Sequence, residues 1–291
     1  MAKSILFTHA HPDDETINNG LTMALYAERG YDVHLVTCTA GEEGEILLGD
    51  LAHLAADKED GLGEVRKVEL ELALAELGDI KHYYLGGFGT FRDSGMMGMP
   101  SNSKPNTFWQ ADLLEASKHL VKLIRQIKPD VLVTYDEFGG YGHPDHIQTH
   151  RVSMYAAQLA ATHGFLPESG EPWQIKKIYW NAIPRERMMN AIACLAERGV
   201  TSEFLSDMPG DAPFLTDDSL ITSRIVAPQY TDKKLKALAA HKTQVDLQGE
   251  FFTTMQMLGD DLSASEYYRM VYPKSSSQES REFETDLFAD I

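Results

Sequence analysis

Histidine and carboxylate residues occur together at two widely separated points of the chain. The first group is His9-Ala10-His11-Pro12-Asp13-Asp14-Glu15 and the second is His143-Pro144-Asp145-His146, so the tripeptide His-Pro-Asp occurs in both. Imidazole and carboxylate groups hold catalytic Zn²⁺ in proteins, with three side chains on the ion and one position left for water. The bound water has its pKa lowered towards about 7, which makes hydroxide available at neutral pH. The two groups predict a hydrolytic metal site if the fold joins them.

Each group by itself also has a plainer explanation. The three acids of the first group are typical of a helix start, where they cap N–H groups and complement the helix dipole. The histidines could be ordinary buried side chains of a strand. The pair of groups favours a metal site, to which the first supplies His11 and one aspartate and the second supplies His143 or His146. The remaining carboxylates and the remaining histidine are left for proton transfer.

Both groups follow a predicted buried strand. Apolar patterning predicts strands over residues 5–7, 31–39, 80–85 and 130–135 and helices over 16–29, 64–77, 111–127 and from the second group to about 161. This alternation predicts a doubly wound, mostly parallel, Rossmann-like α/β sheet with helices on both faces. Ligands bind at the carboxyl ends of the strands in such sheets, which is where both groups lie.

The pattern loosens after residue 164. It predicts strands over 176–183 and 220–226, helices over 186–198 and 231–242, and a polar surface tail over 274–284. We therefore expect an α/β metal-binding catalytic core over residues 1–165 and a smaller α+β portion over 166–291. The second portion is expected to complete the substrate pocket within one compact unit.

Composition narrows the possible partners. The net charge is −18, and no stripe of Lys and Arg offsets it, so nucleic acid is excluded as a partner and a neutral small molecule is favoured. The two cysteines, Cys38 and Cys194, form no CxxC pair. No apolar run approaches the roughly 18 residues of a membrane span, and we predict a cytoplasmic protein without a membrane partner. The sequence does not predict an oligomeric state.

The two groups resemble the motifs of the LmbE/PIG-L family of zinc-dependent N-deacetylases, a His-Pro-Asp-Asp-Glu turn and a later His-Pro-Asp-His. The likeness runs nearly end to end, and within the family it is strongest to the branch that deacetylates N-acetylglucosaminyl-inositol in mycothiol biosynthesis. Further matching segments are residues 37–45, 92–96, 139–146, 240–245 and 284–287.

The resemblance implies roles for individual residues. It implies one Zn²⁺ per subunit, with Fe²⁺ as the other ion that such a site accepts, on His11, Asp14 and His146. The implied catalytic residues are Asp13 as general base, Tyr141 as donor to the oxyanion, His143 as the charged histidine that protonates the leaving amine, and Asp145 as the carboxylate that orients His143.

The resemblance also implies contacts to a small amino-sugar substrate. Arg66 and Asp93 would reach the sugar and inositol hydroxyls, and Glu45 and Asn18 would line the same mouth. Arginine offers several donors to neighbouring hydroxyls and a carboxylate accepts from them. Without the resemblance, Arg66 would be read as part of a solvated helix face.

Four alternatives compete with the deacetylase. A non-haem iron oxygenase also uses two histidines and one carboxylate, and the helix–strand alternation of this chain disfavours it. A dinucleotide-binding dehydrogenase is excluded because no G-x-G-x-x-G follows the first strand. A sugar-binding protein that retains the metal without turnover would not need Asp13 and His143 together. A mycothiol S-conjugate amidase shares the metal site, and the acidic segment 42–45 favours the deacetylase over it.

Overall fold

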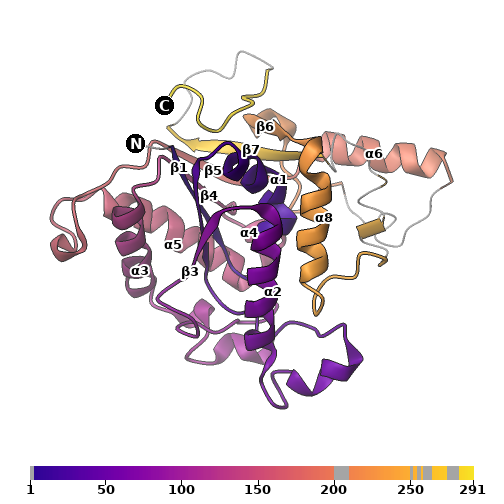
Figure 1. Ribbon diagram of the computed structural model, residues 1–291, viewed down its shortest axis with the longest axis horizontal. Helices are drawn as coiled ribbons and strands as arrows, with labels where there is room; N and C mark the ends of the chain where they lie inside the picture. Colours follow the sequence, from indigo (N-terminus) through magenta and orange to yellow (C-terminus); the bar gives the residue numbers. More distant parts are fainter. Residues whose placement is uncertain (1–2, 200–209, 250–251, 254–256, 258–263, 274–281) are drawn as a thin grey trace.

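Seven strands in the described part of the chain form one mixed sheet (Figure 1). The computed structural model describes residues 3–199, 210–249, 252–253, 257, 264–273 and 282–291. The strands are β1 Ser4–His9, β2 Asp32–Thr37, β3 Ile80–Tyr84, β4 Val131–Thr134, β5 Lys177–Ala182, β6 Ser223–Val226 and β7 Ser265–Tyr272. Their order across the sheet is β3-β2-β1-β4-β5-β7-β6. The first five strands in that order are parallel, and β7 is antiparallel to both of its neighbours.

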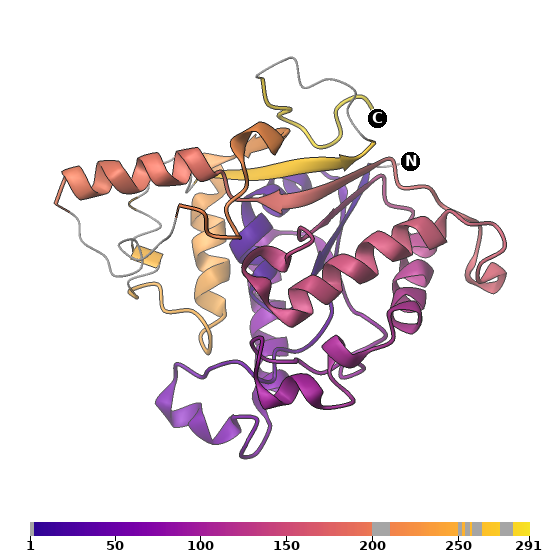
Figure 2. The same cartoon turned by 180° about the vertical axis from the view of Figure 1, so that it is seen from behind.

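Helices cover both faces of the sheet (Figures 1 and 2). The helices on one face are α1 Asp14–Glu28, α2 Leu62–Leu77 and α8 Thr231–Ala240, and those on the other are α3 Leu113–Ile127 and α5 Pro144–Ala160. Two further α-helices of the described residues are the four-residue α4 Gly139–Gly142 and the peripheral α6 Arg185–Glu197. Short 3₁₀ helices span Gly49–Leu54, Pro100–Ser103, Phe108–Gln110, Pro167–Ser169, Asp218–Leu220 and Pro228–Tyr230. Within the described ranges, no helix has the length and apolar character of a membrane span.

Alternation along β1 explains why helices are needed on both faces. Ile5 and Phe7 are fully buried in the core that contains α1, α2 and α8, whereas Leu6 is buried in the core that contains α3 and α5. Successive side chains of a strand point to opposite faces, so an unbroken apolar run requires cover on both sides. The predicted fold class is confirmed.

The connections diverge at β1, and this divergence creates the site. β1 pairs with β2 on one side and with β4 on the other. The chain leaves β1 into α1 on one face and leaves β4 into α5 on the other face. A crevice forms outside the carboxyl ends of such a strand pair. The two histidine-and-carboxylate groups both lie at this crevice.

The second part of the chain continues the same sheet. β5, β7 and β6 extend it beyond β4, and β7 is a strand that the pattern-based prediction omits. β7 is held by pairing to both β5 and β6, which is a non-local cause that its own residues do not reveal. Of the predicted polar tail, residues 274–281 lie outside the described residues. Glu284, at its end, accepts the Tyr179 hydroxyl at 2.5 Å and the Ser223 hydroxyl at 2.8 Å.

Candidate metal centre

The first turn links β1 to α1 through a strained residue. Asp13 has φ 110° and ψ −35°, a conformation rare for residues other than glycine. Strain of this kind costs about 1–3 kcal/mol and is concentrated at functional sites. The Asp13 carbonyl accepts the N–H of Thr16 at 3.0 Å, and the Asp14 carboxylate accepts the N–H of His11 at 2.9 Å. These bonds turn the side chains of the first group towards the crevice.

The second turn has the same tripeptide and a different backbone. His143 is the N-cap of α5, Pro144 opens the helix, and Nδ1 of His143 accepts the N–H of Asp145 at 3.1 Å. Proline suits this position because its missing N–H would have no helical partner there. Before it, Gly139 has φ 67°, and a Cβ at this residue would lie 2.6 Å from the main-chain nitrogen of Ile147. Only glycine allows α4 to lie this close to α5.

The three predicted metal ligands converge between the two turns. Nδ1 of His11, Oδ2 of Asp14 and Nε2 of His146 are separated by 3.3, 3.4 and 3.3 Å around the triangle. A tetrahedral ion bound at about 2.0–2.1 Å requires ligand atoms about 3.3–3.4 Å apart. All three residues are buried, and the ring of His146 is stacked on Tyr135 with centroids 4.3 Å apart. The donor set and its spacing therefore fit a divalent ion such as Zn²⁺.

Two other sets of potential ligands lie in the described chain. His143 joins His11 and His146 in a set whose nitrogens lie within 4.8 Å of one another. The other set combines His11 with Asp93 and Asp145, whose carboxylates already accept main-chain N–H groups. In that second set both carboxylates are held in this way, whereas in the triangle only Asp14 is, through the N–H of His11.

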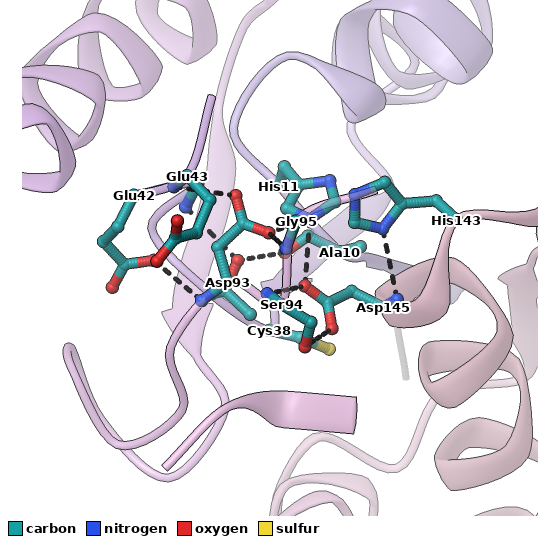
Figure 3. A network of polar contacts seen from close by, with 12 residues as sticks. Ala10, His11, Cys38, Glu42, Glu43, Asp93, Ser94, Gly95, His143 and Asp145 are labelled. Carbon is teal, nitrogen blue, oxygen red and sulfur yellow. Dashed lines mark hydrogen bonds and ion pairs between the residues drawn. The ribbon is translucent and has the colours of Figure 1, made fainter. Parts of the chain in front are cut away.

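The Asp145 carboxylate lies next to the His11 ring (Figure 3). Its Oδ2 atom is 3.3 Å from Nε2 of His11, the ring nitrogen that faces away from the triangle. Ser94 holds this carboxylate, with its N–H 2.8 Å from Oδ2 and its hydroxyl bonded to Oδ1. A carboxylate on the second nitrogen of a ligating histidine fixes the ring and its tautomer. The expected pairing of the Asp145 carboxylate with His143 is replaced by this contact, and Asp145 reaches His143 through its main-chain N–H.

Asp93 lies on the same side of His11 and is buried. Its Oδ1 atom accepts the N–H of Gly95 at 2.8 Å and lies 3.5 Å from Nε2 of His11, while Oδ2 accepts the N–H of Glu43 at 3.2 Å. Burial opposes the charge, yet His11 and these N–H groups keep the pKa of Asp93 well below its ordinary value. In this geometry Asp93 supports the site, and its contact with a substrate stays a prediction.

His143 differs electrostatically from the expected charged histidine. Burial, with the neighbouring imidazoles of His11 and His146, lowers the pKa of His143 to about 2. Its Nδ1 atom is occupied as an acceptor, so the neutral ring carries its proton on Nε2. His143 is thereby arranged as a hydrogen-bond donor from Nε2. The His143 and His11 rings lie 4.5 Å apart between centroids.

Arg66 is directed at the first turn. Its guanidinium is 3.0 Å from Oδ2 of Asp13 and donates to the carbonyls of Pro12 at 2.5 Å and Gly41 at 2.8 Å. Only 3% of Arg66 is exposed, which contradicts a solvated helix face. Burial raises the pKa of Asp13 to about 6, and the charge of Arg66 opposes that rise. Arg66 is therefore a partner of Asp13, and its contact with sugar hydroxyls stays a prediction.

Tyr141 lies in the glycine-rich segment that precedes the second turn. It is half exposed, with its ring 5.0 Å from that of His146 and 6.2 Å from that of His143 between centroids. Gly140 and Gly142 flank it at φ 67° and 91°. The predicted oxyanion donor thus lies at the rim of the crevice, on backbone that glycine makes adaptable.

Asn18 and Glu45 differ in their surroundings. Asn18 donates to the Asp14 carbonyl at 2.8 Å and lines a cavity of about 480 Å³ that also contacts Tyr135 and Gly140. Glu45 is exposed, and its carbonyl accepts the Gln244 amide at 2.9 Å. Contacts of both residues with a substrate stay predictions.

The prediction omitted three residues that support the site. Ser94 holds Asp145, and Glu15 and His241 form a fully buried pair with Nε2 3.0 Å from Oε1. Burial disfavours the Glu15 charge, but His241 and the hydrogen bonds from Thr16 and Asp13 together lower the pKa of Glu15 to about 2. Burial likewise disfavours a charged His241, and Glu15 raises the pKa of His241 above its ordinary value. Glu15 lies within the first motif, Ser94 within the matching segment 92–96 and His241 within the matching segment 240–245, and these were the available signals.

Comparison with known proteins agrees with this architecture. Residues 6–157 match the family model described as PIG-L: GlcNAc-PI de-N-acetylase. The chain is 50% identical, over 100% of its length and 90% of the relative's, to 1D-myo-inositol 2-acetamido-2-deoxy-alpha-D-glucopyranoside deacetylase 1 of Catenulispora acidiphila.

Solved structures share the fold at low identity. The N,N'-diacetylchitobiose deacetylase of Pyrococcus horikoshii has a TM-score of 0.64 at 19% identity, covering 92% of this chain and 84% of its own. GalB, the 4-carboxy-2-hydroxymuconate hydratase of Pseudomonas putida, has a TM-score of 0.58 at 18% identity, covering 96% and 100%. A deacetylase and a hydratase thus share this fold, so the fold alone does not identify the reaction. The family match and the identity over the whole chain do identify the lineage, and the chain belongs to the PIG-L family.

Proposed function

We propose that the protein is a metal-dependent hydrolase that removes the acetyl group from 1D-myo-inositol 2-acetamido-2-deoxy-α-D-glucopyranoside, as part of mycothiol biosynthesis. The substrate follows from the name of the relative that is 50% identical over the whole chain. The observation that carries the chemistry is the equal-sided triangle of His11, Asp14 and His146, preceded in the first turn by Asp13, whose carboxylate is held by Arg66. The predicted cytoplasmic location is kept as part of this proposal.

The ion would be held by Nδ1 of His11, Oδ2 of Asp14 and Nε2 of His146, one per chain. Zn²⁺ or Fe²⁺ bound there supplies a Lewis acid for the amide carbonyl and lowers the pKa of water. Asp145 and Ser94 hold the His11 ring, which would leave the lone pair of Nδ1 available to the ion.

Asp13 takes the proton from water in this proposal. Because Asp14 is a ligand, a second carboxylate is needed as a free base, and Asp13 is the adjacent one. Arg66 fixes the Asp13 carboxylate at 3.0 Å and favours its ionised, proton-accepting form. A base poised near neutral pH contributes a factor of roughly 10²–10⁴ to the rate.

His143 and Tyr141 stabilise charge on the substrate side. The Nε2–H of His143 donates to the oxygen on which negative charge develops, and the Tyr141 hydroxyl donates to the same oxygen when the ring moves inward. The protonation of the leaving amine remains assigned to His143, whose Nε2–H would pass to the amine nitrogen as the C–N bond breaks. The proton that Asp13 takes from water would then return the ring to its neutral form. Preorganised donors of this kind are worth roughly 10²–10³ in kcat each.

A substrate panel tests the proposal. Metal-free protein and protein reconstituted with Zn²⁺ or Fe²⁺ are incubated with the inositol pseudodisaccharide, with N-acetylglucosamine and with a mycothiol S-conjugate, and free amine is measured. We expect metal-dependent turnover with the highest kcat/KM on the pseudodisaccharide. Faster cleavage of the S-conjugate would identify the amidase instead, and tight metal and sugar binding without amine release would identify a binding protein.

A further inference from the structure

A buried ion pair lies next to the proposed base and outside the reacting groups. Glu15 and His241 are both fully buried, with Nε2 of His241 3.0 Å from Oε1 of Glu15. The two residues are 226 positions apart in the sequence. His241 follows the end of α8, so the pair joins the C-terminal part of the chain to the first turn.

Glu15 bonds directly to the main chain of Asp13. Its Oε2 atom accepts the N–H of Asp13 at 2.9 Å, and Oε1 accepts the Thr16 hydroxyl at 2.6 Å. This N–H belongs to the residue whose φ is 110°. A main-chain conformation of this kind persists only where surrounding contacts hold it, and the Glu15 carboxylate is one such contact.

His241 is itself held in place. Its N–H donates to the Leu238 carbonyl at 3.1 Å, and its carbonyl accepts the N–H of Val245 at 2.8 Å. Two positions on, the N–H and hydroxyl of Thr243 bond the Glu69 carboxylate at 2.8 and 2.7 Å. Glu69 is on α2, the helix that also carries Arg66. Asp13 is therefore connected to the end of α8 through its main-chain N–H, by way of Glu15 and His241, and to α2 through its carboxylate, by way of Arg66.

We propose that His241 and Glu15 are positioning residues for Asp13, so that the segment after α8 sets the orientation of the base. The proposal rests on the function proposed above for Asp13. His241 neutralises a carboxylate that is completely shielded from water and gives it a donor, which leaves Oε2 directed at the Asp13 N–H. Without that partner the buried carboxylate would lose its compensation and the turn would relax.

The test compares His241→Leu, which removes the donor, with His241→Gln, which can restore one, and with Glu15→Gln. The matched control is His34→Leu, because His34 is also buried and has its Nε2 3.0 Å from an aspartate, Asp32, away from the turn. Each variant is measured for kcat, KM, bound metal and hydrogen exchange of the peptide that contains the Asp13 amide.

For His241→Leu we expect kcat to fall about 10- to 100-fold, since small displacements of a catalytic group cost factors of this size. KM and metal content should stay within about twofold, and the Asp13 peptide should exchange faster. His241→Gln should recover most of kcat, Glu15→Gln should match His241→Leu, and His34→Leu should change neither kcat nor exchange at Asp13. If His241→Leu does not fold, the same measurements on the two Gln variants and the control test the proposal.

Wild-type kcat and unchanged exchange in His241→Leu, or in Glu15→Gln where that variant decides, would overturn the inference. A fall in kcat that only follows loss of metal would do the same. Hydrogen exchange keeps the two proposals separable, because it reports on the Asp13 amide even if the wild-type protein deacetylates nothing. An inactive wild type with faster exchange in the variants would refute the proposed function and support the positioning role.

Discussion

The two His-Pro-Asp turns have the same three residues, but the histidine and the aspartate have different roles in the two turns. In the first, the histidine is a proposed ligand and the aspartate is the proposed base on a strained residue with φ 110°. In the second, the histidine caps α5 and the aspartate is directed back at the histidine of the first turn. The next residue also differs in function, because Asp14 and His146 reach the triangle from the two sides.

The difference arises from what the backbone does at each proline. The first turn begins its helix one residue after Asp13, whereas α5 begins at Pro144 itself. The same tripeptide is therefore displaced by two positions relative to its helix. A motif in a sequence thus identifies residue types, and the helix start determines which atom of each residue faces the site.

The largest expected effect separates the two aspartates. Asp13→Asn should lower kcat by about 10²–10⁴ while metal content stays that of the wild type, because the base is lost and the ligands remain. Asparagine tolerates positive φ, so the strained turn is preserved. Turnover and metal analysis on the same preparation check this. The control is Asp112→Asn at the exposed start of α3, which should leave both unchanged. Metal-free Asp13→Asn protein would contradict the ligand assignment.

The next effect separates the two histidines of the second turn. His146→Ala should weaken metal binding by more than about 100-fold, exceeding the loss that supporting residues cause, whereas His143→Ala should retain the metal and lose kcat. Competition with a coloured chelator measures both. If both variants lost the metal, the ion would lie on the alternative set, which contains His143 together with His146.

A smaller effect is expected behind the first turn. Asp145→Asn and Ser94→Ala should weaken metal binding about 10- to 100-fold, because both hold the ring of His11. Ser153→Ala is the matched control, since Ser153 is also buried on α5 and bonds Thr8 instead. Unchanged metal affinity in Asp145→Asn, with a changed pH profile of kcat, would contradict this role and show instead that the Asp145 carboxylate orients His143.

The smallest effect concerns the thiol that lies between the two turns. Cys38 donates its main-chain N–H to His9 at 2.9 Å, and its sulfur accepts the Thr149 hydroxyl at 3.4 Å. Burial raises the pKa of Cys38 to about 12, so the thiol stays protonated and unreactive below that pH. Iodoacetamide at pH 8 should therefore label the exposed Cys194 alone, before and after removal of metal. Labelling of Cys38 on metal removal would show that the thiol belongs to the ion's surroundings.

Sequence patterns predicted most of the sheet, and the two groups that carry the proposed ligands, for a local reason. Buried parallel strands are continuous apolar runs, so strands 1 to 4 and the helices between them were readable, and the two motifs follow strands β1 and β4 directly. The contacts that support the site are non-local. Ser94 and Asp145 are 51 positions apart, and His241 and Glu15 are 226 apart. Helical periodicity likewise placed Arg66 on a helix without showing that this face covers the first turn.

Anomalous diffraction at the zinc edge from crystals of the reconstituted protein tests the central claim most directly. The account predicts one ion per chain, about 2.0–2.2 Å from Nδ1 of His11, Oδ2 of Asp14 and Nε2 of His146, with the Asp13 carboxylate beside it and not bound to it. An ion coordinated by His143, or by Asp93 and Asp145, would contradict the account.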